Sequence, residues 1–434
     1  MSGALARAYE ANPDLNSERA GVRASDENVP KAKAGWLPNI SAAASAAYEY
    51  SVSINDPLEP GLQKMAATPR DYGVTATQTL FDGQRTANAV SGAESGALMA
   101  RETLRDAEST ILLAAATAYM DVLRDTATLA LRRNNVAVLE VELQNAQSRF
   151  DANEVTRTDV EQAKTALATG RADVALARAR LDASAATYRR TIGAEPVRLN
   201  PAQPIEKLLP PSLDGAIDLA LAKNPTILGA LHQVDVDEAA VKAAESALSP
   251  TATAAANVQQ QYDVTGIPGY NQTIAAVGGQ IDIPIYQGGA EYAAIRGAKE
   301  RLGKTRLAVE TRRRAVRADV TVAWAQLAAA RASIPATEAN VKAAEFALDG
   351  VREEAKDGLR TTQDILNAQQ DLLNARVRLV TAQRDRVVAS YAVMSAMGLL
   401  SARRLALSVA IYDPAVHYRQ TRNRFFGMTT PDGR

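Results

Sequence analysis

The stretch VTATQTLFDGQR, residues 74–85, predicts a β-strand that turns directly into a long helix. Apolar residues alternate with threonine over residues 74–80, the period of two expected of a strand with one apolar and one polar face. Gly83 stands where this strand ends and suits an unusual backbone angle. We expect a helix without a strong breaker from Gln84 to about Arg149, and likewise in the second repeat from Gly289 to about Glu353. Each would be a rod on the order of 100 Å long.

The same arrangement occurs a second time, as VGGQIDIPIYQGG at residues 277–289. Upstream, ARAYEANP (6–13) matches DLALAKNP (218–225) at an offset of 212 residues, and beyond one loop the offset becomes 205. The chain is therefore an internal duplication with repeats of about 200 residues.

Each repeat is predicted to contain a helix, a β-hairpin, a very long helix, a turn and a return helix. The first repeat comprises residues 1–193, with a hairpin at about 40–81, a long helix at 84–149 and a return helix at 155–192. The second comprises residues 212–398, with a hairpin at about 252–286, a long helix at 289–353 and a return helix at 361–397. A linker (194–211) and a C-terminal segment (399–434) complete the chain.

Within the first hairpin, period-two alternation predicts one strand from Ile40 to Ile54. Loops rich in proline or glycine are predicted at residues 56–70 and 266–269, between the strands of each hairpin. The return helices have apolar residues at seven-residue spacing, which predicts coiled-coil packing. These residues are Val160, Leu167, Val174, Leu181 and Tyr188, then Ile365, Leu372 and Leu379.

Composition excludes several classes of function. The 49 basic and 49 acidic residues cancel, so no net field attracts nucleic acid. There is no cysteine, and His232 and His417 have no neighbouring ligands at metal spacing, so neither a metal site nor a cofactor is expected. Phosphate-loop, dinucleotide, nucleophile-elbow and HExxH motifs are absent, so the chain is not expected to be an enzyme.

Two observations bear on the membrane. No stretch supplies the ~20 apolar residues of a membrane-spanning helix. The chain opens MSGALARAYE, without the basic and apolar stretches of a secretory signal, so we expect a mature or trimmed sequence. A spanning sheet in lipid must close on itself, and three chains with four strands each would give an even-numbered barrel of twelve strands.

Several motifs resemble the TolC family of outer-membrane factors over roughly residues 1–412. They are the A-x-x-x-NP repeat start, the turns TLFDGQR and PIYQGG, and the segments VTRTDVEQAK and LRTTQDILNAQ. The resemblance implies a mixed fold: a trimeric twelve-stranded β-barrel, four strands per chain, continued by a long α-helical barrel of coiled coils. A mixed equatorial domain would come from residues 195–211 and 400–434.

The resemblance also implies a function. The trimer would be a passive conduit in the outer membrane of a Gram-negative bacterium, with most of its mass in the periplasm. It would work with a periplasmic adaptor (membrane fusion protein) and an inner-membrane RND or ABC pump, in drug efflux or in type I secretion. The segment AIYDPAVHYRQTRNRFFG (410–427) favours the secretion relatives. The alternative is a periplasmic coiled-coil adaptor or structural protein, which two amphipathic hairpins in tandem repeats disfavour.

In this family the periplasmic end closes as an iris. The matching gate positions here are Asp364, Asn367, Asp159, Arg360 and Thr158. Three Asp364 carboxylates in one ring would bind a blocking multivalent cation. The spacings Thr156-x-x-Asp159 and Thr361-x-x-Asp364 also predict helix-capping boxes, and the two roles are compatible.

The turns between long and return helices are the implied docking site of the adaptor. The residues at these tips are Asn153, Glu154 and Val155 in the first repeat and Gly358 and Leu359 in the second. Gly358 suits a left-handed turn, and Asn153, in the matching place, tolerates the same backbone.

Overall fold

A computed structural model describes residues 1–54, 61–264, 267 and 269–433. The chain forms two compact units, and each repeat contributes to both. Unit 1 comprises residues 1–21, 101–229 and 309–413, and unit 2 comprises residues 22–100, 230–308 and 414–434. The boundaries of the repeats are therefore not the boundaries of the compact units.

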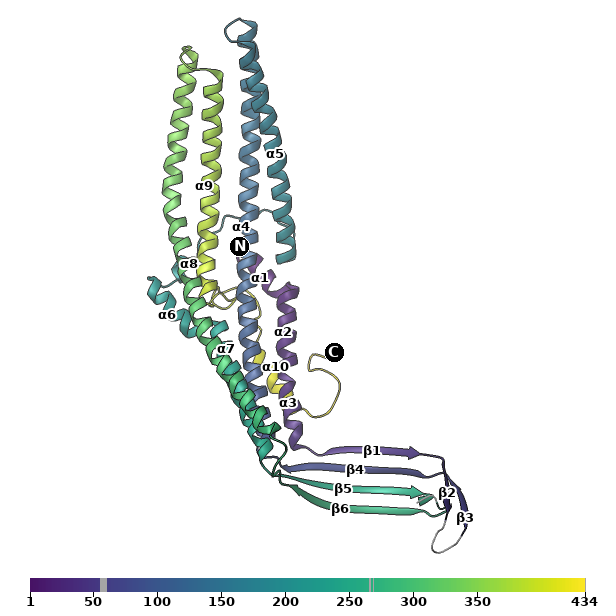
Figure 1. The fold of residues 1–434 in the computed structure, drawn as a ribbon. Coiled ribbons are helices and arrows are strands. Elements are labelled where there is room, and N and C mark those ends of the chain that lie inside the picture. The colour runs from purple at the N-terminus through teal and green to yellow at the C-terminus, as the bar shows by residue number, and fades with distance from the viewer. Residues whose placement is uncertain (55–60, 265–266, 268, 434) are drawn as a thin grey trace. The chain divides into compact units, whose positions relative to one another are not determined.

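The helices and strands alternate in the order expected of two repeats (Figure 1). The first repeat contains α1 (Ser2–Ala11), α2 (Pro13–Asp26), α3 (Asn28–Lys33), β1 (Asn39–Ala46), β2 (Glu49–Ile54), β3 (Leu62–Ala67), β4 (Arg70–Phe81), α4 (Arg85–Asp151) and α5 (Arg157–Ile192). The second contains α6 (Leu213–Lys223), α7 (Pro225–Glu245), β5 (Thr251–Tyr262), β6 (Gln272–Asp282), α8 (Ala290–Lys356) and α9 (Thr362–Ala396). The last helix is α10 (Pro414–Thr421), and short 3-10 helices lie at Ala34–Trp36, Glu206–Leu208 and Ser246–Leu248.

The two rods have the predicted length. Helices α4 and α8 have 67 residues each, which at ~1.5 Å per residue is about 100 Å. Helix α4 begins sharply because the Asp82 carboxylate accepts the backbone N–H of Thr86 at 2.8 Å, as an N-cap does. Gly83 has φ +63°, and a Cβ there would lie 2.4 Å from the Cβ of Ser249, so this turn needs glycine.

Helix α8 was expected to be free of breakers, yet Pro335 lies inside it. Proline has no N–H to donate to the carbonyl four residues earlier. The helix continues, and the Thr337 hydroxyl donates to the carbonyls of Ser333 at 2.8 Å and Ile334 at 2.9 Å.

The NP motif that opens each repeat joins two helices. Asn12 separates α1 from α2: its Oδ1 accepts the N–H of Asp14 at 2.9 Å, and its Nδ2 donates to the Thr191 carbonyl at 3.0 Å. Asn224 makes the same pair of bonds, with Thr226 at 2.9 Å and Ala396 at 3.0 Å. Each buried amide therefore caps one helix and fastens it to the C-terminal end of the return helix of its own repeat.

The predicted heptads lie on the packed faces of α5 and α9. Val160, Leu167 and Tyr188 are buried in α5, as is Leu372 in α9. The other heptad residues, Val174, Leu181, Ile365 and Leu379, are half-buried. In unit 1, Leu139 of α4, Leu167 of α5 and Leu366 of α9 form one apolar cluster. The return helices thus pack against each other and against α4, which confirms the packing that the seven-residue spacing predicts.

Unit 2 contains a four-stranded antiparallel sheet in the order β1-β4-β5-β6 (Figure 1). Cross-strand partners match in polarity: Val74 pairs with Ala42 on one side and Val258 on the other, and Ala256 pairs with Val277. The neighbouring pairs are polar, such as Thr75 with Asn257. Since side chains alternate across a sheet, one face is largely apolar and the other polar, as the sequence pattern predicts. The extra residue Leu80 forms a bulge between Thr79 and Phe81.

The first hairpin departs from the prediction in two ways. The strand expected from Ile40 to Ile54 is broken after Ala46, and β2 begins at Glu49. The loop expected at residues 56–70 contains β3, which pairs with β2 as a separate two-stranded sheet. The loop prediction was therefore wrong for residues 62–67; residues 56–60 of that loop, and residues 265, 266 and 268, lie outside the described part.

The ends of the chain also differ in detail from the prediction. The helix expected before the first hairpin is three helices, α1 to α3. The C-terminal segment divides between the two units, since residues 399–413 belong to unit 1 and 414–434 to unit 2. Of the helices in the described ranges, none has the length and hydropathy that crossing a bilayer would require.

Candidate functional site at the helix tips

Asp364 and Asp159 close the capping boxes that the sequence predicts. Asp364 Oδ2 accepts the backbone N–H of Thr361 at 2.9 Å and the Thr361 hydroxyl at 2.8 Å. Asp159 Oδ2 accepts the corresponding groups of Thr156 at 2.9 and 2.6 Å. Each threonine oxygen in turn accepts the N–H of its aspartate, so both helices begin with a reciprocal pair.

These bonds favour the ionised carboxylates. The pKa of Asp364 is lowered by the hydrogen bonds from the backbone and hydroxyl of Thr361 and by the charge of Arg360. The pKa of Asp159 is lowered chiefly by the Thr156 hydroxyl, against an opposing effect of burial. Both aspartates are only partly exposed. Two fixed negative charges therefore stand at the N-termini of α5 and α9, where the helix dipole also stabilises them.

The two tip turns have the same backbone. Asn153 has φ +61° and Gly358 has φ +73°. The following N–H groups reach back across each turn, from Glu154 to the Arg149 carbonyl at 2.8 Å and from Leu359 to the Glu354 carbonyl at 2.9 Å. This is the hydrogen-bonding pattern of a helix C-terminus closed by a left-handed residue. The asparagine of the first repeat thus occupies the conformation expected of it.

An arginine–glutamate ion pair lies at each tip. Arg360 Nε lies 2.7 Å from Glu354 Oε2, and Arg149 Nε lies 3.3 Å from Glu154 Oε2. The hydrogen bond to Glu354 raises the pKa of Arg360. Leu359 is 75% exposed, so the second tip presents an apolar side chain beside its ion pair.

Thr158 and Asn367 come together from different repeats. Both line a groove of about 430 Å³ in unit 1, between α5 and α9. Its wall is mostly amides and hydroxyls: Gln162, Thr165, Gln363, Gln369 and Gln370. Asn367 accepts a hydrogen bond from Gln363 at 2.8 Å. Asp159, Asp364 and Arg360 do not line this groove, so the five gate positions divide between the groove and the helix N-termini.

A second groove in unit 1 involves the first tip. Glu154 and Arg149 line it together with Glu142, Arg352 and Lys356. Arg352 forms an ion pair across it, 3.6 Å from Glu142. The ends of the two long helices therefore enclose a groove of mixed charge.

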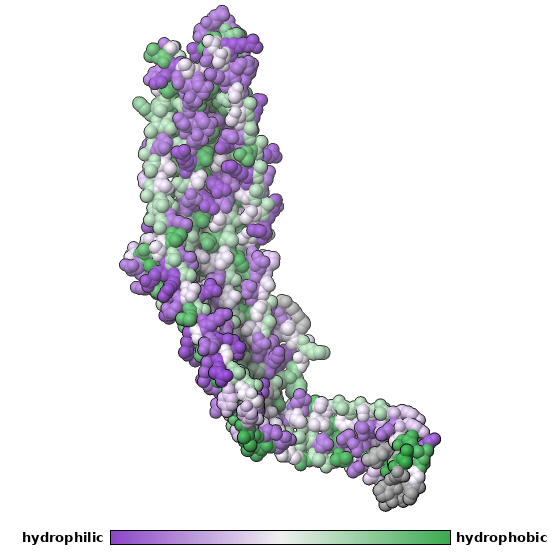
Figure 2. Space-filling view, viewed as in Figure 1, coloured by the Kyte–Doolittle hydropathy of each residue, from purple (hydrophilic) through white to green (hydrophobic). Residues whose placement is uncertain are grey.

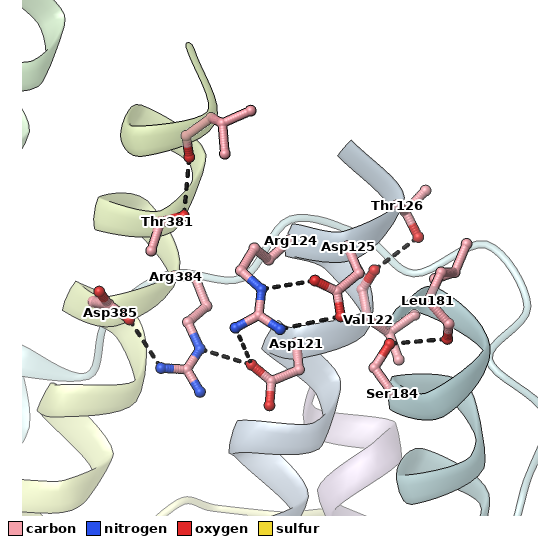
Figure 3. Close-up of polar contacts among 11 residues, drawn as sticks. Asp121, Val122, Arg124, Asp125, Thr126, Leu181, Ser184, Thr381, Arg384 and Asp385 are labelled. Atoms are coloured by element: carbon pink, nitrogen blue, oxygen red, sulfur yellow. Dashed lines mark hydrogen bonds and ion pairs between the residues drawn. The ribbon is translucent and has the colours of Figure 1, made fainter. Parts of the chain in front are cut away.

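The sequence did not predict an ion-pair network between α4 and α9 in unit 1. Asp121 Oδ1 is 3.0 Å from Nη1 of Arg124 and accepts a bond from Nε of Arg384 at 2.9 Å (Figure 3). Arg124 also donates to both oxygens of Asp125, at 2.8 and 3.0 Å, and Arg384 to Asp385 at 2.9 Å (Figure 3). The hydrogen bond with Asp125 raises the pKa of Arg124, against an opposing effect of burial. The network joins α4 of the first repeat to α9 of the second.

A second set of ion pairs joins the linker to α8 and α9 of the second repeat. Glu206 Oε1 accepts from Arg386 at 2.8 Å, and Glu206 Oε2 is 3.0 Å from Arg331. These arginines, Arg386 first, lower the pKa of Glu206. The closely spaced opposite charges at 121–125 and 384–386 could have indicated ion pairs. The local sequence does not show, however, that these two segments contact each other.

Groups of three or more His, Asp or Glu side chains that could hold a metal ion are absent from the described residues. The carboxylates of Asp121, Asp125 and Glu206 instead contact arginines, and those of Asp159 and Asp364 close helix caps. The arrangement places hydrogen bonds and ion pairs between the helices of unit 1, and it places fixed negative charge at the N-termini of α5 and α9.

Comparison with known proteins agrees with this arrangement. The sequence profile described as "Outer membrane efflux protein" matches residues 4–194 and 216–399. The outer membrane efflux protein BepC of Brucella suis is 41% identical over 440 residues, covering 100% of this chain and 93% of that protein. The outer membrane protein TolC of Escherichia coli is 26% identical and covers 93% of this chain and 83% of its own.

Solved structures show the same fold. The Campylobacter jejuni CmeC outer membrane channel superposes with a TM-score of 0.81 at 14% identity, covering 97% of this chain and 88% of that one. The Vibrio cholerae outer membrane protein VceC superposes with a TM-score of 0.75 at 19% identity, over 91% and 95% of the two chains. With a profile matching both repeats and a relative of high identity over the whole length, the chain belongs to the outer membrane efflux protein family, the TolC family.

Proposed function

We propose that three copies of the chain close a twelve-stranded β-barrel in the outer membrane and form a passive conduit from the periplasm to the exterior. The observation that supports it most directly is the two-faced sheet of unit 2. Its apolar face suits lipid and its polar face suits a water-filled lumen. Within the described residues, β1 and β6 each pair on one side only, so each chain offers two open edges. In lipid such edges must be paired.

The dimensions support the same proposal. Strands β4 and β5 have 12 residues each, about 40 Å at ~3.3 Å per residue, against a hydrocarbon core of about 30 Å. The helices of unit 1 would continue the conduit as a barrel of coiled coils, with most of the mass in the periplasm. Alternative roles as an adaptor or a soluble structural protein would leave the lipid-compatible face without a purpose.

For the gate, we propose that Asp364 and Asp159 face the pore at the periplasmic end of the trimer. Their lowered pKa favours the ionised carboxylates, and rings of three such charges would select cations and bind multivalent ones. The groove shared by Thr158 and Asn367 is the surface along which α5 and α9 would slide on opening, because its amide and hydroxyl contacts can be exchanged for water.

For docking, we propose that a periplasmic adaptor contacts the tip turns, from Asn153 to Val155 and at Gly358 and Leu359. The exposed Leu359 and the mixed-charge groove beside Glu154 are surfaces of the kind that a helical partner would cover. The pump would be an inner-membrane RND or ABC transporter. Both efflux of small molecules and type I secretion of a polypeptide are compatible with the conduit.

Disulfide trapping tests the closed barrel, since the chain has no native cysteine. Ala43→Cys in β1 is combined with single cysteines at Ala276, Gly278 or Gln280 of β6, all on the polar face. If β1 of one copy pairs with β6 of the next, oxidation gives covalent trimers on a denaturing gel. The matched control is Thr75→Cys, which lies between two strands of its own chain and should give none. Monomers in every combination, together with no conductance in planar bilayers, would refute the proposal.

A further inference from the structure

Residues 422–428, RNRFFGM, form the most exposed apolar surface in the C-terminal part of unit 2. Phe426 is 91% exposed, Met428 97% and Phe425 43%. Water-exposed aromatic and thioether side chains of this kind indicate a surface that something else covers. We name this segment the C-terminal hook.

The hook is fastened to the helices that lead into the sheet. Upstream, His417 of α10 is buried, and its Nδ1 lies 3.1 Å from Oδ2 of the fully buried Asp26 of α2. At the hook itself, the Lys33 ammonium of α3 donates to the Arg422 carbonyl at 3.2 Å and to Oδ1 of Asn423 at 3.1 Å. Two separate contacts therefore hold this part of the chain against α2 and α3.

The turn of the hook is built to direct its apolar side chains outward. Gly427 has φ +98°, a conformation that suits glycine. The Arg424 guanidinium spans the turn, donating to the Phe426 carbonyl at 3.4 Å and to the Thr429 hydroxyl at 3.1 Å. The Phe426 carbonyl and the Thr429 hydroxyl are thus bonded to Arg424, while the side chains of Phe426 and Met428 are exposed.

The hook lies close to the end of the sheet where strands and helices join. Lys33 precedes Asn39, the first residue of β1, by six residues, so the backbone separates them by at most about 20 Å. Figure 2 shows hydrophobic side chains where the strands of unit 2 meet its helices. Exposed residues at this end are Trp36, Phe81, Ile283, Ile285 and Tyr286. Such a girdle is typical of the interface between lipid and water.

The positive charge around the hook indicates the kind of surface that would cover it. Residues 414–433 contain Arg419, Arg422 and Arg424 but a single acidic residue, Asp432. Cationic side chains beside exposed aromatic ones match an anionic phospholipid surface, in which arginines meet phosphates and apolar side chains enter the region between headgroups and acyl chains. A protein partner would be expected to cover a flatter surface with a polar rim.

We propose that the C-terminal hook is an interfacial anchor that inserts Phe426 and Met428 into the periplasmic leaflet of the outer membrane beside the barrel. This inference rests on the proposed barrel, and it adds a lipid contact outside the strands. The anchor would fix the height of α2 and α3 against the membrane, because Lys33 and His417 tie the hook to both helices.

A single labelled cysteine tests the anchor in the intact trimer, reconstituted in vesicles of phosphatidylcholine with phosphatidylglycerol. Phe426→Cys carries an environment-sensitive fluorophore. Val277→Cys, 87% exposed on the apolar face of β6, reports on the barrel, and the exposed Asp151→Cys is the water reference. We expect emission at 426 to shift to the blue relative to 151, with quenching by spin-labelled lipid and protection from iodide.

Charge is tested with the same label. The blue shift at 426 should decrease in vesicles of phosphatidylcholine alone, and Arg419→Gln with Arg422→Gln should remove the difference between the two lipid mixtures. A label at 426 quenched by iodide but not by lipid would overturn the anchor while a lipid-quenched label at 277 left the barrel intact. Protection at 426 from both quenchers would also overturn it, since the hook would then be buried against protein. Iodide quenching at 277 would instead count against the barrel itself.

Discussion

Arg384 of α9 donates a hydrogen bond of 2.9 Å to Asp121 of α4, and this bond joins the return helix of one repeat to the long helix of the other. Both side chains are about four-fifths buried, at 20% and 24% exposure. Asp121 also holds Arg124, so one carboxylate serves two arginines (Figure 3). Helix α9 begins at its N-terminus with the Asp364 cap, 20 residues before Arg384, or about 30 Å along the helix.

Arg384→Gln should loosen α9 from α4 without changing the charge at the tip. A partly buried ion pair of this kind contributes roughly 1–2 kcal/mol, which corresponds to about a tenfold change in an equilibrium. If α9 moves when the conduit opens, the variant should raise the open probability of single channels in planar bilayers. Arg378→Gln, an exposed arginine on the same helix, is the control and should leave it unchanged. If both variants had the same open probability, the Arg384–Asp121 ion pair would have no role in gating.

Asp364 combines a cap and a charge, and two substitutions separate them. Asp364→Asn keeps an oxygen that accepts the Thr361 N–H but removes the charge, whereas Asp364→Ala removes both. We expect both variants to weaken block by multivalent cations, measured as the blocking concentration in planar bilayers. Only the alanine variant should also loosen the tip, measured by amide hydrogen exchange of the first turn of α9. Undiminished block in both variants would remove Asp364 from the pore.

Gly358→Trp should abolish crosslinking to the adaptor while the trimer remains intact. The glycine has φ +73°, so a side chain there strains the turn, and indole bulk would obstruct the tip. Gly358→Asn is the matched control, because Asn153 already occupies the same conformation at φ +61°. Crosslinking yield and trimer bands on a gel are the two measurements. Full crosslinking of the tryptophan variant would place the adaptor elsewhere.

Much of the fold followed from local sequence signals. The ends of the rods lie within three residues of the predicted positions, since Gly83 and the threonine caps act on their own neighbours. The apolar and polar faces of the sheet could be predicted from the alternation of residues, because side chains point to opposite faces of a strand whichever strand it pairs with. The capping role of Asp159 and Asp364 could likewise be predicted from their spacing to the preceding threonines.

What the sequence could not supply was pairing between distant segments. Strand β3, with the sequence LQKMAA, has little alternation of its own and is a strand because β2 lies beside it. Asp121 and Arg384 are 263 positions apart, and no local pattern connects them. The same holds for His417 and Asp26, which secure a C-terminal segment that had been expected to lie entirely in the equatorial domain.

Asn224→Ala should destabilise the protein because three hydrogen bonds end on this buried amide. The Ala396 carbonyl and the N–H and hydroxyl of Thr226 would lose their partner. Leaving buried polar groups unpaired costs about 1–3 kcal/mol each before relaxation. Asn224→Asp is the informative comparison: it keeps the acceptor for Thr226 but loses the donor to Ala396, so it should fall between. Unfolding temperatures followed by circular dichroism would rank the three proteins, and an alanine variant as stable as the parent would contradict the role of the NP motif.

Glu108 should make the stability of unit 1 depend on pH. Burial raises its pKa above the ordinary 4.5, even though Arg19, Arg105 and Arg403 and the Ala402 N–H, 2.7 Å from Oε1, act in the opposite direction. A carboxyl whose pKa is raised by folding binds its proton more tightly in the folded state. Its contribution is therefore complete below pH 4.5 and is lost as pH rises through the folded value. Glu108→Gln keeps an acceptor for Ala402 without the charge, so its unfolding temperature should exceed that of the parent by a margin that grows from pH 4.5 upward. Glu10→Gln, at an exposed carboxylate of α1, should show no such growth, and a margin that shrinks with pH would mean that the nearby arginines outweigh burial.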